Sequence, residues 1–199
     1  VRGTGMEHAE ILRVSALTGE GIDRLGDHLR QMISETSGRR DQGPFRLPVD
    51  RTFVVKGFGL VSTGTVLSGR LREGEMIEML PACRQLRVRG IQQHGALVDE
   101  VRTGDRAAIN IPGLEQSEIQ RGDTLASPDF LRPTHMLDVT LKLLSSSPRE
   151  LQQRARVRLH IGTAEILARV VLLDRDVLER GDEALAQLRL ESPVAAVWG

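Results

Sequence analysis

The hydrophobic residues of the chain follow two different periods. In the first forty residues, apolar side chains recur every three or four positions, at Ile22, Leu25, Leu29, Met32 and Ile33. This spacing places them on one face of a helix. From Phe45 onwards the apolar residues tend to recur at every second position, which is typical of strands with one face on a core. The pattern predicts one amphipathic helix followed by a long all-β region.

Runs rich in β-branched residues predict the individual strands. Residues 49–56 and 60–67 flank Gly57-Phe58-Gly59, which indicates a hairpin. Further strands are predicted at residues 9–14, 137–144, 155–161, 165–173 and 185–190. Four glycine–acid pairs predict tight turns, because glycine adopts positive φ and the acid bonds nearby backbone: Gly74-Glu75, Gly104-Asp105, Gly122-Asp123 and Gly181-Asp182. Short strands with regular turns are typical of a barrel or a sandwich.

The polar segments divide the chain into three parts. Residues 34–42 are polar and contain glycine, which predicts a linker, and residues 130–133 predict a second connection. We therefore expect a strand–helix piece and linker over 1–43, a first β-barrel over 44–130 and a second over 131–199. The expected fold class is mainly β, with two consecutive barrels.

Composition excludes several classes of protein. The 199 residues contain 27 Lys and Arg against 27 Asp and Glu, and only 3% are aromatic. Zero net charge argues against binding nucleic acid by bulk charge, and few aromatic residues argue against a base-stacking platform. The single cysteine, Cys83, excludes a disulfide framework and a cysteine-built zinc site. The five histidines show no metal-ligand spacing, so no metal site is predicted. No apolar run reaches the ~18 residues of a membrane span, and we expect a cytoplasmic protein.

One segment carries a clear resemblance to a known family. Residues 50–69, DRTFVVKGFGLVSTGTVLSG, resemble the second domain of translational GTPases and are similar to the selenocysteine-specific elongation factors, SelB. Residues 87–95, 104–110 and 119–125 fit the same family in order, and residues 159–165 resemble its third domain. The resemblance implies a segment of a longer factor: the last strand and helix of the GTP-binding domain, the first barrel and most of the second, without its last strand.

The resemblance also implies partners and cofactors. The full-length protein would be a GTPase that uses GTP and Mg²⁺, binds selenocysteyl-tRNA and delivers it to the ribosome. It would read the mRNA hairpin only through a C-terminal region that this chain does not contain. The sequence has no G-x-x-x-x-G-K-[ST] phosphate loop, so we expect no catalytic residue, no cofactor and no GTP hydrolysis in this chain. Ser15-Ala16-Leu17 is similar to the last guanine-contacting loop of a GTPase, and an ordinary strand-to-helix loop is the alternative.

The family's aminoacyl pocket matches Asp50, Arg51 and Arg106, and His94 lies in a segment that could line it. A selenocysteine side chain is largely a selenolate at neutral pH, whereas serine is neutral, so a partly desolvated arginine can separate them. Two unit charges about 4 Å apart attract by ~4 kcal/mol at an effective dielectric near 20, before desolvation is subtracted. The alternative is a surface Asp-Arg pair, an arginine after a turn and an ordinary surface or core histidine.

Arginines alternate with apolar residues at Arg154, Arg156 and Arg158. In a strand this spacing places all three guanidinium groups on one face, where they suit phosphate groups. The resemblance implies that this face contacts tRNA, and a solvated barrel face is the alternative. Two other functions stay open: a general aminoacyl-tRNA carrier or other translational GTPase with the same barrels, and a protein-interaction barrel without a tRNA role.

Overall fold

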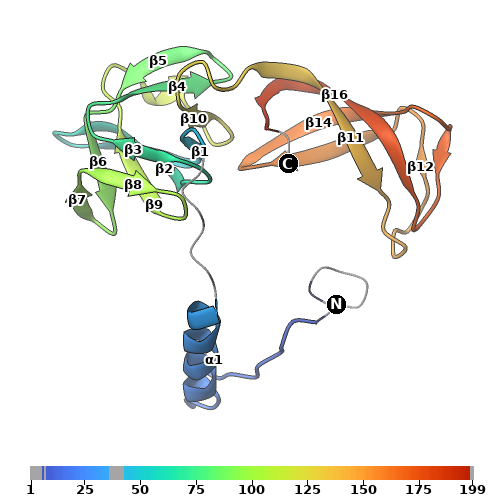
Figure 1. Cartoon of the computed structure of the whole chain (residues 1–199), viewed down its shortest axis with the longest axis horizontal. Helices are drawn as coiled ribbons and strands as arrows, with labels where there is room; N and C mark the ends of the chain where they lie inside the picture. Colours follow the sequence, from blue (N-terminus) through green and yellow to red (C-terminus); the bar gives the residue numbers. More distant parts are fainter. Residues whose placement is uncertain (1–5, 7, 36–42, 198–199) are drawn as a thin grey trace.

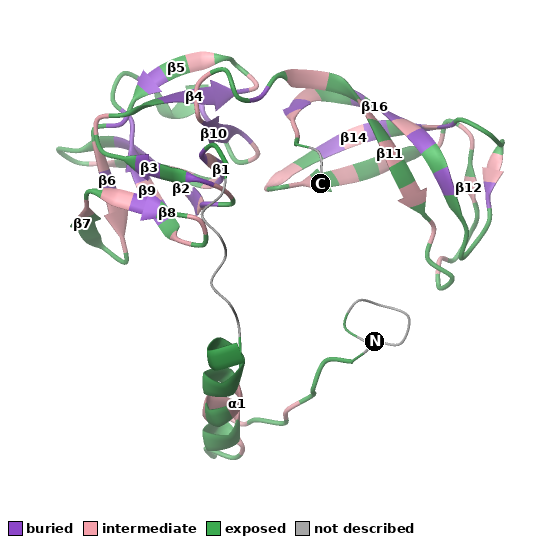
Figure 2. Cartoon of the chain, viewed as in Figure 1, coloured by how far each residue is buried: buried purple, intermediate pink, exposed green. Residues whose placement is uncertain are grey.

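The structure is a computed structural model that describes residues 6, 8–35 and 43–197. It contains helix α1 (Ile22–Glu35) and two all-β parts that follow one another along the chain (Figure 1). Buried residues gather inside the two β parts, whereas α1 has no buried residue (Figure 2). The described residues contain no helix with the length and apolar character that crossing a membrane requires.

The first β part is built around one long antiparallel sheet. Its strands are β1 (Arg46–Val55), β2 (Gly59–Thr65), β3 (Arg70–Arg72), β4 (Met76–Leu80), β5 (Arg84–Arg87), β6 (Gly90–Gln93), β7 (Ala96–Val98), β8 (Glu100–Arg102), β9 (Arg106–Asn110) and β10 (Thr124–Ala126). The sheet order is β5-β4-β10-β1-β2-β9-β6-β7, and β3 pairs with β8. Strand β1 pairs with β10 through its first residues and with β2 through the rest. Strand β1 therefore has a neighbouring strand on each side, and the sheet wraps around a core.

Alternation along the strands separates this core from an outer face. In β9, Ala107 and Ile109 are buried in the core, while Arg106 is exposed. At Gly64 in β2 the packing is so close that a Cβ atom would lie 2.3 Å from the carbonyl oxygen of Pro48. The outer face of β1, β2, β6 and β9 is where the predicted pocket residues lie.

The second β part is a four-stranded antiparallel sheet with a small ribbon. Its strands are β11 (Pro133–Lys142), β12 (Leu151–Gln152), β13 (Arg156–Ile161), β14 (Ala164–Leu172), β15 (Val177–Leu178) and β16 (Glu183–Ala195). The sheet order is β11-β16-β14-β13, and β12 pairs with β15. Core side chains of the central strands, such as Val170 and Leu188, are buried, whereas Val139 and Leu159 on the edge strands are half-buried. Within the described residues, β11 and β13 therefore each have one unpaired edge.

The structure confirms the local predictions and corrects one of them. The glycines of all four predicted turns have positive φ, with values of 84°, 99°, 101° and 90° at Gly74, Gly104, Gly122 and Gly181. Helix α1 covers the predicted periodic segment. The strand predicted at residues 9–14 is wrong: these residues form no strand, because a single extended segment without a neighbouring strand has no ladder to join. Most of the predicted linker, residues 36–42, lies outside the described residues.

Candidate functional site

An ion pair links two strands that are far apart in the sequence. The guanidinium group of Arg106 donates two hydrogen bonds to Asp50, from Nη1 to Oδ2 at 2.5 Å and from Nη2 to Oδ1 at 3.1 Å. The hydroxyl of Thr63 donates to Asp50 Oδ1 at 2.8 Å. The pairing of β1 with β2 shifts between Val49 and Arg51, so Asp50 occupies a bulge. The fold thus brings the predicted residues Asp50 and Arg106 into direct contact.

This contact shifts the pKa values of both partners in the direction that favours their charged forms. The hydrogen bond from Arg106 holds the pKa of Asp50 below its ordinary value, and the charge of Arg51 adds to the effect. The same hydrogen bond raises the pKa of Arg106. Asp50 and Arg106 are therefore both charged at neutral pH. Two arginines and one aspartate leave a local net charge of one positive unit.

His94 lies beside Arg106 because of a tight hairpin. Strands β6 and β7 are joined by His94 and Gly95, whose φ angles are 51° and 82°. Two central residues with positive φ form a type I′ turn, which suits the twist of a two-residue hairpin. His94, Arg106, Thr63 and Gln92 line one hollow of about 280 Å³. The structure therefore gathers two predicted pocket residues, His94 and Arg106, in a single cavity, and Arg51 is exposed on the adjoining strand.

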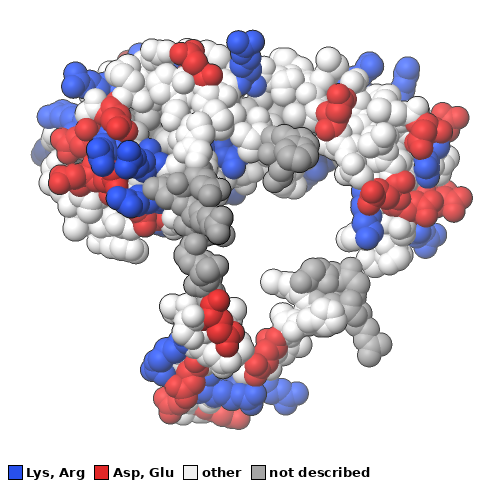
Figure 3. All heavy atoms as spheres, viewed as in Figure 1, with Lys and Arg blue, Asp and Glu red and all other residues white. Residues whose placement is uncertain are grey.

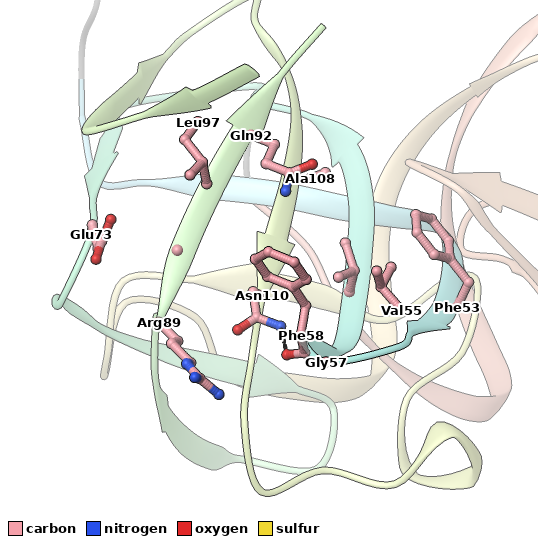
Figure 4. Close-up of a pocket in the computed structure, with 12 residues that line it drawn as sticks. Phe53, Val55, Gly57, Phe58, Glu73, Arg89, Gln92, Leu97, Ala108 and Asn110 are labelled. Atoms are coloured by element: carbon pink, nitrogen blue, oxygen red, sulfur yellow. Dashed lines mark hydrogen bonds between the residues drawn. The ribbon is translucent and has the colours of Figure 1, made fainter. Parts of the chain in front are cut away.

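A second, larger hollow adjoins the first and was not predicted. It has a volume of about 460 Å³ and shares Gln92 and Ala108 with the hollow around Arg106. Figure 4 shows the rings of Phe53 and Phe58 among the side chains that line it. The amide of Asn110 donates to the carbonyl oxygens of Phe58 at 2.5 Å and Leu60 at 3.0 Å, which holds the glycine-rich hairpin over the site. The available sequence signal was that two of the four phenylalanines of the chain flank or occupy this hairpin.

The predicted arginine row of the second barrel is only partly formed. Strand β13 begins at Arg156, and Arg154 precedes it with a φ of 60°. The prediction that Arg154 shares a strand face with Arg156 and Arg158 is wrong, because this left-handed residue lies in the turn that leads into the strand. Arg156 donates two hydrogen bonds to Glu191, at 2.8 and 2.7 Å, and Arg158 lies 3.6 Å from Glu165.

Strand pairing forms a different arginine row. Arg156 lies opposite Arg169, and Arg169 lies opposite Arg189, so the three residues cross β13, β14 and β16. Arg189 donates to Gln187 at 3.2 Å, and in the described part of the chain neither Arg169 nor Arg189 has a carboxylate within ion-pair distance. Figure 3 shows acidic and basic side chains interspersed on this barrel. The sequence does not reveal this row, because it depends on the register of three strands.

The Ser15-Ala16-Leu17 segment lies in the loop before α1. The amide of Gly19 donates to the carbonyl oxygen of Ser15 at 2.9 Å, and the amide of Thr18 lies 3.3 Å from Ser15 Oγ. Leu17 is 95% exposed. The loop is therefore a compact, accessible turn. Across the residues that the structure describes, no three His, Cys, Asp or Glu side chains are grouped as a metal site.

Two known domain families match the two β parts. Residues 59–126 match the family described as elongation factor Tu domain 2. Residues 137–199 match the beta-barrel domain of selenocysteine-specific elongation factor. The two matched domains therefore define the class of this chain as translation elongation factor.

Comparisons over the whole chain narrow this class. The chain is 45% identical over 197 residues to the selenocysteine-specific elongation factor of Desulfomicrobium baculatum, covering 99% of this chain and 31% of that protein. The crystal structure of apo SelB from Methanococcus maripaludis matches with a TM-score of 0.82 and 27% identity, covering 96% of this chain and 45% of that one. A bacterial EF-Sec structure matches with a TM-score of 0.77 and 26% identity, over 94% of this chain and 30% of that one. The chain is a segment of a SelB-type translation factor and spans about a third of the length of the curated relatives it matches.

Proposed function

We propose that this chain holds the aminoacyl end of selenocysteyl-tRNA, within a longer factor that delivers this tRNA to the ribosome for selenocysteine incorporation at recoded UGA codons. The observation that carries the proposal is the charged hollow on the outer face of the first barrel. Arg106 and His94 line this hollow. Asp50 pairs with Arg106, and the charge of Arg51 acts on Asp50, so the cluster of two arginines and one aspartate has a net charge of one positive unit. A selenolate carries one negative charge, so the cluster complements it.

Asp50 orients Arg106 but leaves some of its hydrogen-bond donors without a partner in this pair. A guanidinium group has five N–H donors, and Asp50 takes two hydrogen bonds from Arg106. The side chain of Arg106 is 51% exposed, so its remaining donors are accessible to a ligand. The serine of a mischarged tRNA would gain little from this charge, because its hydroxyl is neutral. The arrangement thus favours selenocysteine over serine electrostatically.

The larger apolar hollow suits the terminal nucleoside of the same tRNA. Its Phe53 and Phe58 rings offer flat apolar surface for a purine, and Asn110 and Gln92 supply polar groups for orientation. Because both hollows share Gln92 and Ala108, one ligand can extend from the apolar hollow to Arg106. A nucleoside esterified with selenocysteine would fit this arrangement, with its base in the apolar hollow and its charged amino-acid side chain near Arg106.

The second barrel would contact the phosphates of the tRNA. Arg156, Arg169 and Arg189 lie side by side on three strands, and Arg158 follows Arg156 on β13. Neighbouring strands are about 4.8 Å apart, so their guanidinium groups can share a phosphodiester backbone. Like charges directly opposite one another cost stability, and a bound polyanion would remove this cost. Arg154, which the resemblance also suggested, stays a candidate from the adjoining turn.

GTP and Mg²⁺ belong to the proposal for the full-length protein alone. The exposed Ser15-Ala16-Leu17 turn is small and accessible, which fits a role in contacting the guanine base. The phosphates and the metal ion would be held by residues outside this chain, since its sequence has no phosphate loop. The factor would act in the cytoplasm, where charged tRNA and ribosomes are found.

The proposal is tested by replacing Arg106 in the full-length protein. Binding of selenocysteyl-tRNA and seryl-tRNA with the same tRNA body is titrated for wild type and Arg106→Ala. We expect a loss of about tenfold or more for selenocysteyl-tRNA, equivalent to about 1.4 kcal/mol, and little change for seryl-tRNA. Arg102→Ala is the matched control, because Arg102 is an exposed arginine of the same barrel that pairs with Glu100. Equal losses for both tRNAs with Arg106→Ala would remove the pocket assignment.

The two alternatives make different demands on the chain. A carrier of ordinary amino acids has little use for two arginines at the aminoacyl end, so the charge of the hollow argues against it. A protein-interaction barrel without a tRNA role would bind no tRNA at low salt. Phosphate contacts would instead give affinity that falls steeply with salt.

A further inference from the structure

The turn between β13 and β14 connects the second barrel to the first by direct contacts. Thr163 in this turn donates a hydrogen bond from Oγ1 to the carbonyl oxygen of Val49 at 2.6 Å. The preceding Gly162 packs so closely that a Cβ atom there would lie 3.1 Å from the ring of Pro48. Arg121 Nε lies 3.3 Å from the carbonyl oxygen of Thr163. The turn therefore meets the first barrel at the start of β1.

The backbone of Val49 is held on both sides at this contact. Its carbonyl oxygen also accepts from the amide of Gly122 at 3.0 Å, and its own amide donates to the carbonyl oxygen of Asp123 at 2.8 Å. With Thr163, the carbonyl oxygen of Val49 uses both of its lone pairs. The first barrel supplies two of these three bonds, and the second barrel supplies the remaining one.

Val49 immediately precedes the bulge that presents Asp50. The pairing of β1 with β2 shifts between Val49 and Arg51, which leaves Asp50 as the extra residue. A bulge bends its strand and redirects the side chain that it carries, so its geometry depends on the bonds that flank it. The bond from Thr163 is one of those flanking bonds, although 114 positions separate it from Val49.

The direction of the Asp50 carboxylate in turn sets the position of Arg106. Both oxygens of Asp50 accept from Arg106, and Thr63 steadies one of them. We propose that Thr163 is a positioning residue for the aminoacyl pocket: its hydroxyl fixes the bulge that aims Asp50, and through it Arg106, at the side chain of the bound amino acid. The inference rests on the proposed function and adds that selectivity depends on how the second barrel docks on the first.

The experiment compares Thr163→Val and Thr163→Ser in the full-length protein. Valine keeps the shape of threonine without the hydroxyl, and serine keeps the hydroxyl. We expect Thr163→Val to reduce the preference for selenocysteyl-tRNA over seryl-tRNA by about fivefold, the effect of losing one hydrogen bond, and Thr163→Ser to restore it. Arg121→Gln is the control, because it removes another contact of the same interface without touching Val49.

A second measurement needs no tRNA. The carboxyl group of Asp50 is titrated by NMR in wild type and in both variants, and we expect Thr163→Val to raise the pKa of Asp50 towards its ordinary value as the bond from Arg106 loosens. An unchanged titration together with unchanged selectivity would overturn the proposal. If Thr163→Val weakened the binding of both tRNAs equally, the proposal would also be overturned, because a contact that only stabilises the fold would have this effect. If wild type itself does not distinguish the two tRNAs, the proposed function fails while the titration still decides whether Thr163 positions Asp50.

Discussion

Asp50 and Arg106 are 56 positions apart in the sequence and are joined by two hydrogen bonds across the outer face of the first barrel. The pair is only partly shielded, with 24% of the Asp50 side chain and 51% of the Arg106 side chain exposed. Arg106 is therefore both oriented by a carboxylate and accessible to a ligand. This combination is what a site needs if it is to recognise one negative charge at a defined position.

Replacing Asp50 is expected to change how stability depends on pH. Since Arg106 holds the pKa of Asp50 below its ordinary value, the pair stabilises the fold above about pH 4, and this contribution is lost as the pH falls through the lowered pKa. Asp50→Asn should therefore lower the free energy of unfolding at pH 7 by about 1 kcal/mol or less, as expected for a partly exposed pair. Urea denaturation between pH 7 and pH 3 should show wild type and variant converging on the acid side. A constant difference across this range would contradict the assignment.

Two glycines of the first barrel offer a matched test of packing. A Cβ atom at Gly64 would lie 2.3 Å from the carbonyl oxygen of Pro48 and 2.5 Å from Leu47 Cδ2, whereas one at Gly90 would meet no atom within 4 Å. Gly64→Ala should lower the free energy of unfolding by about 2–3 kcal/mol or more. Gly90→Ala should change it by less than about 0.5 kcal/mol. Chemical denaturation measures the free energy of unfolding of both variants. Similar values for the two would contradict the close packing at Gly64.

Ser62 carries a hydroxyl into the core of the first barrel. The residue is fully buried, and its Oγ has no hydrogen-bond partner among the described residues. Because a buried hydroxyl without a partner pays its desolvation cost in full, Ser62→Ala should leave stability unchanged or raise it by about 1 kcal/mol. Ser127→Ala should instead be destabilising by about 1 kcal/mol, because Ser127 Oγ accepts from the amide of Phe45 at 3.0 Å. A clear loss of thermal stability in Ser62→Ala would indicate a partner for its hydroxyl.

The arginine row of the second barrel predicts a salt effect. In the full-length protein, changing Arg169 and Arg189 together to glutamine should weaken the binding of selenocysteyl-tRNA and of seryl-tRNA by the same factor. The slope of log affinity against log salt should fall by up to about 0.7–0.9 for each phosphate group that the variant no longer neutralises. The control is a double change of Arg149 and Arg180 to glutamine, which removes the same charge from exposed positions elsewhere in this barrel. Equal slopes for the two double variants would show that the row does not bind phosphate.

Local features of the fold followed from the sequence because short-range forces determine them. The period of three to four residues predicted α1, and glycine–acid pairs predicted turns at Gly74, Gly104, Gly122 and Gly181, whose positive φ angles the structure confirms. Each of these features depends on sterics and hydrogen bonds within a few residues. The same local reasoning was wrong for residues 9–14, since a strand needs a partner, and for Arg154, whose left-handed backbone interrupts the alternation.

In the candidate site, too, some features could be predicted from the sequence and others appear only in the tertiary structure. Residue chemistry and resemblance were enough to select Asp50, Arg106 and His94, and the structure places His94 and Arg106 in one hollow. The bulge at Asp50, the apolar hollow beside it, the opposition of Arg169 to Arg189, and the bond from Thr163 to Val49 appear only in the folded chain. Strand register and barrel docking arise from packing between segments that are far apart in the sequence, so no short stretch of residues encodes them. The amino-acid sequence thus specifies the local elements and their chemistry, and long-range packing decides which side chains meet.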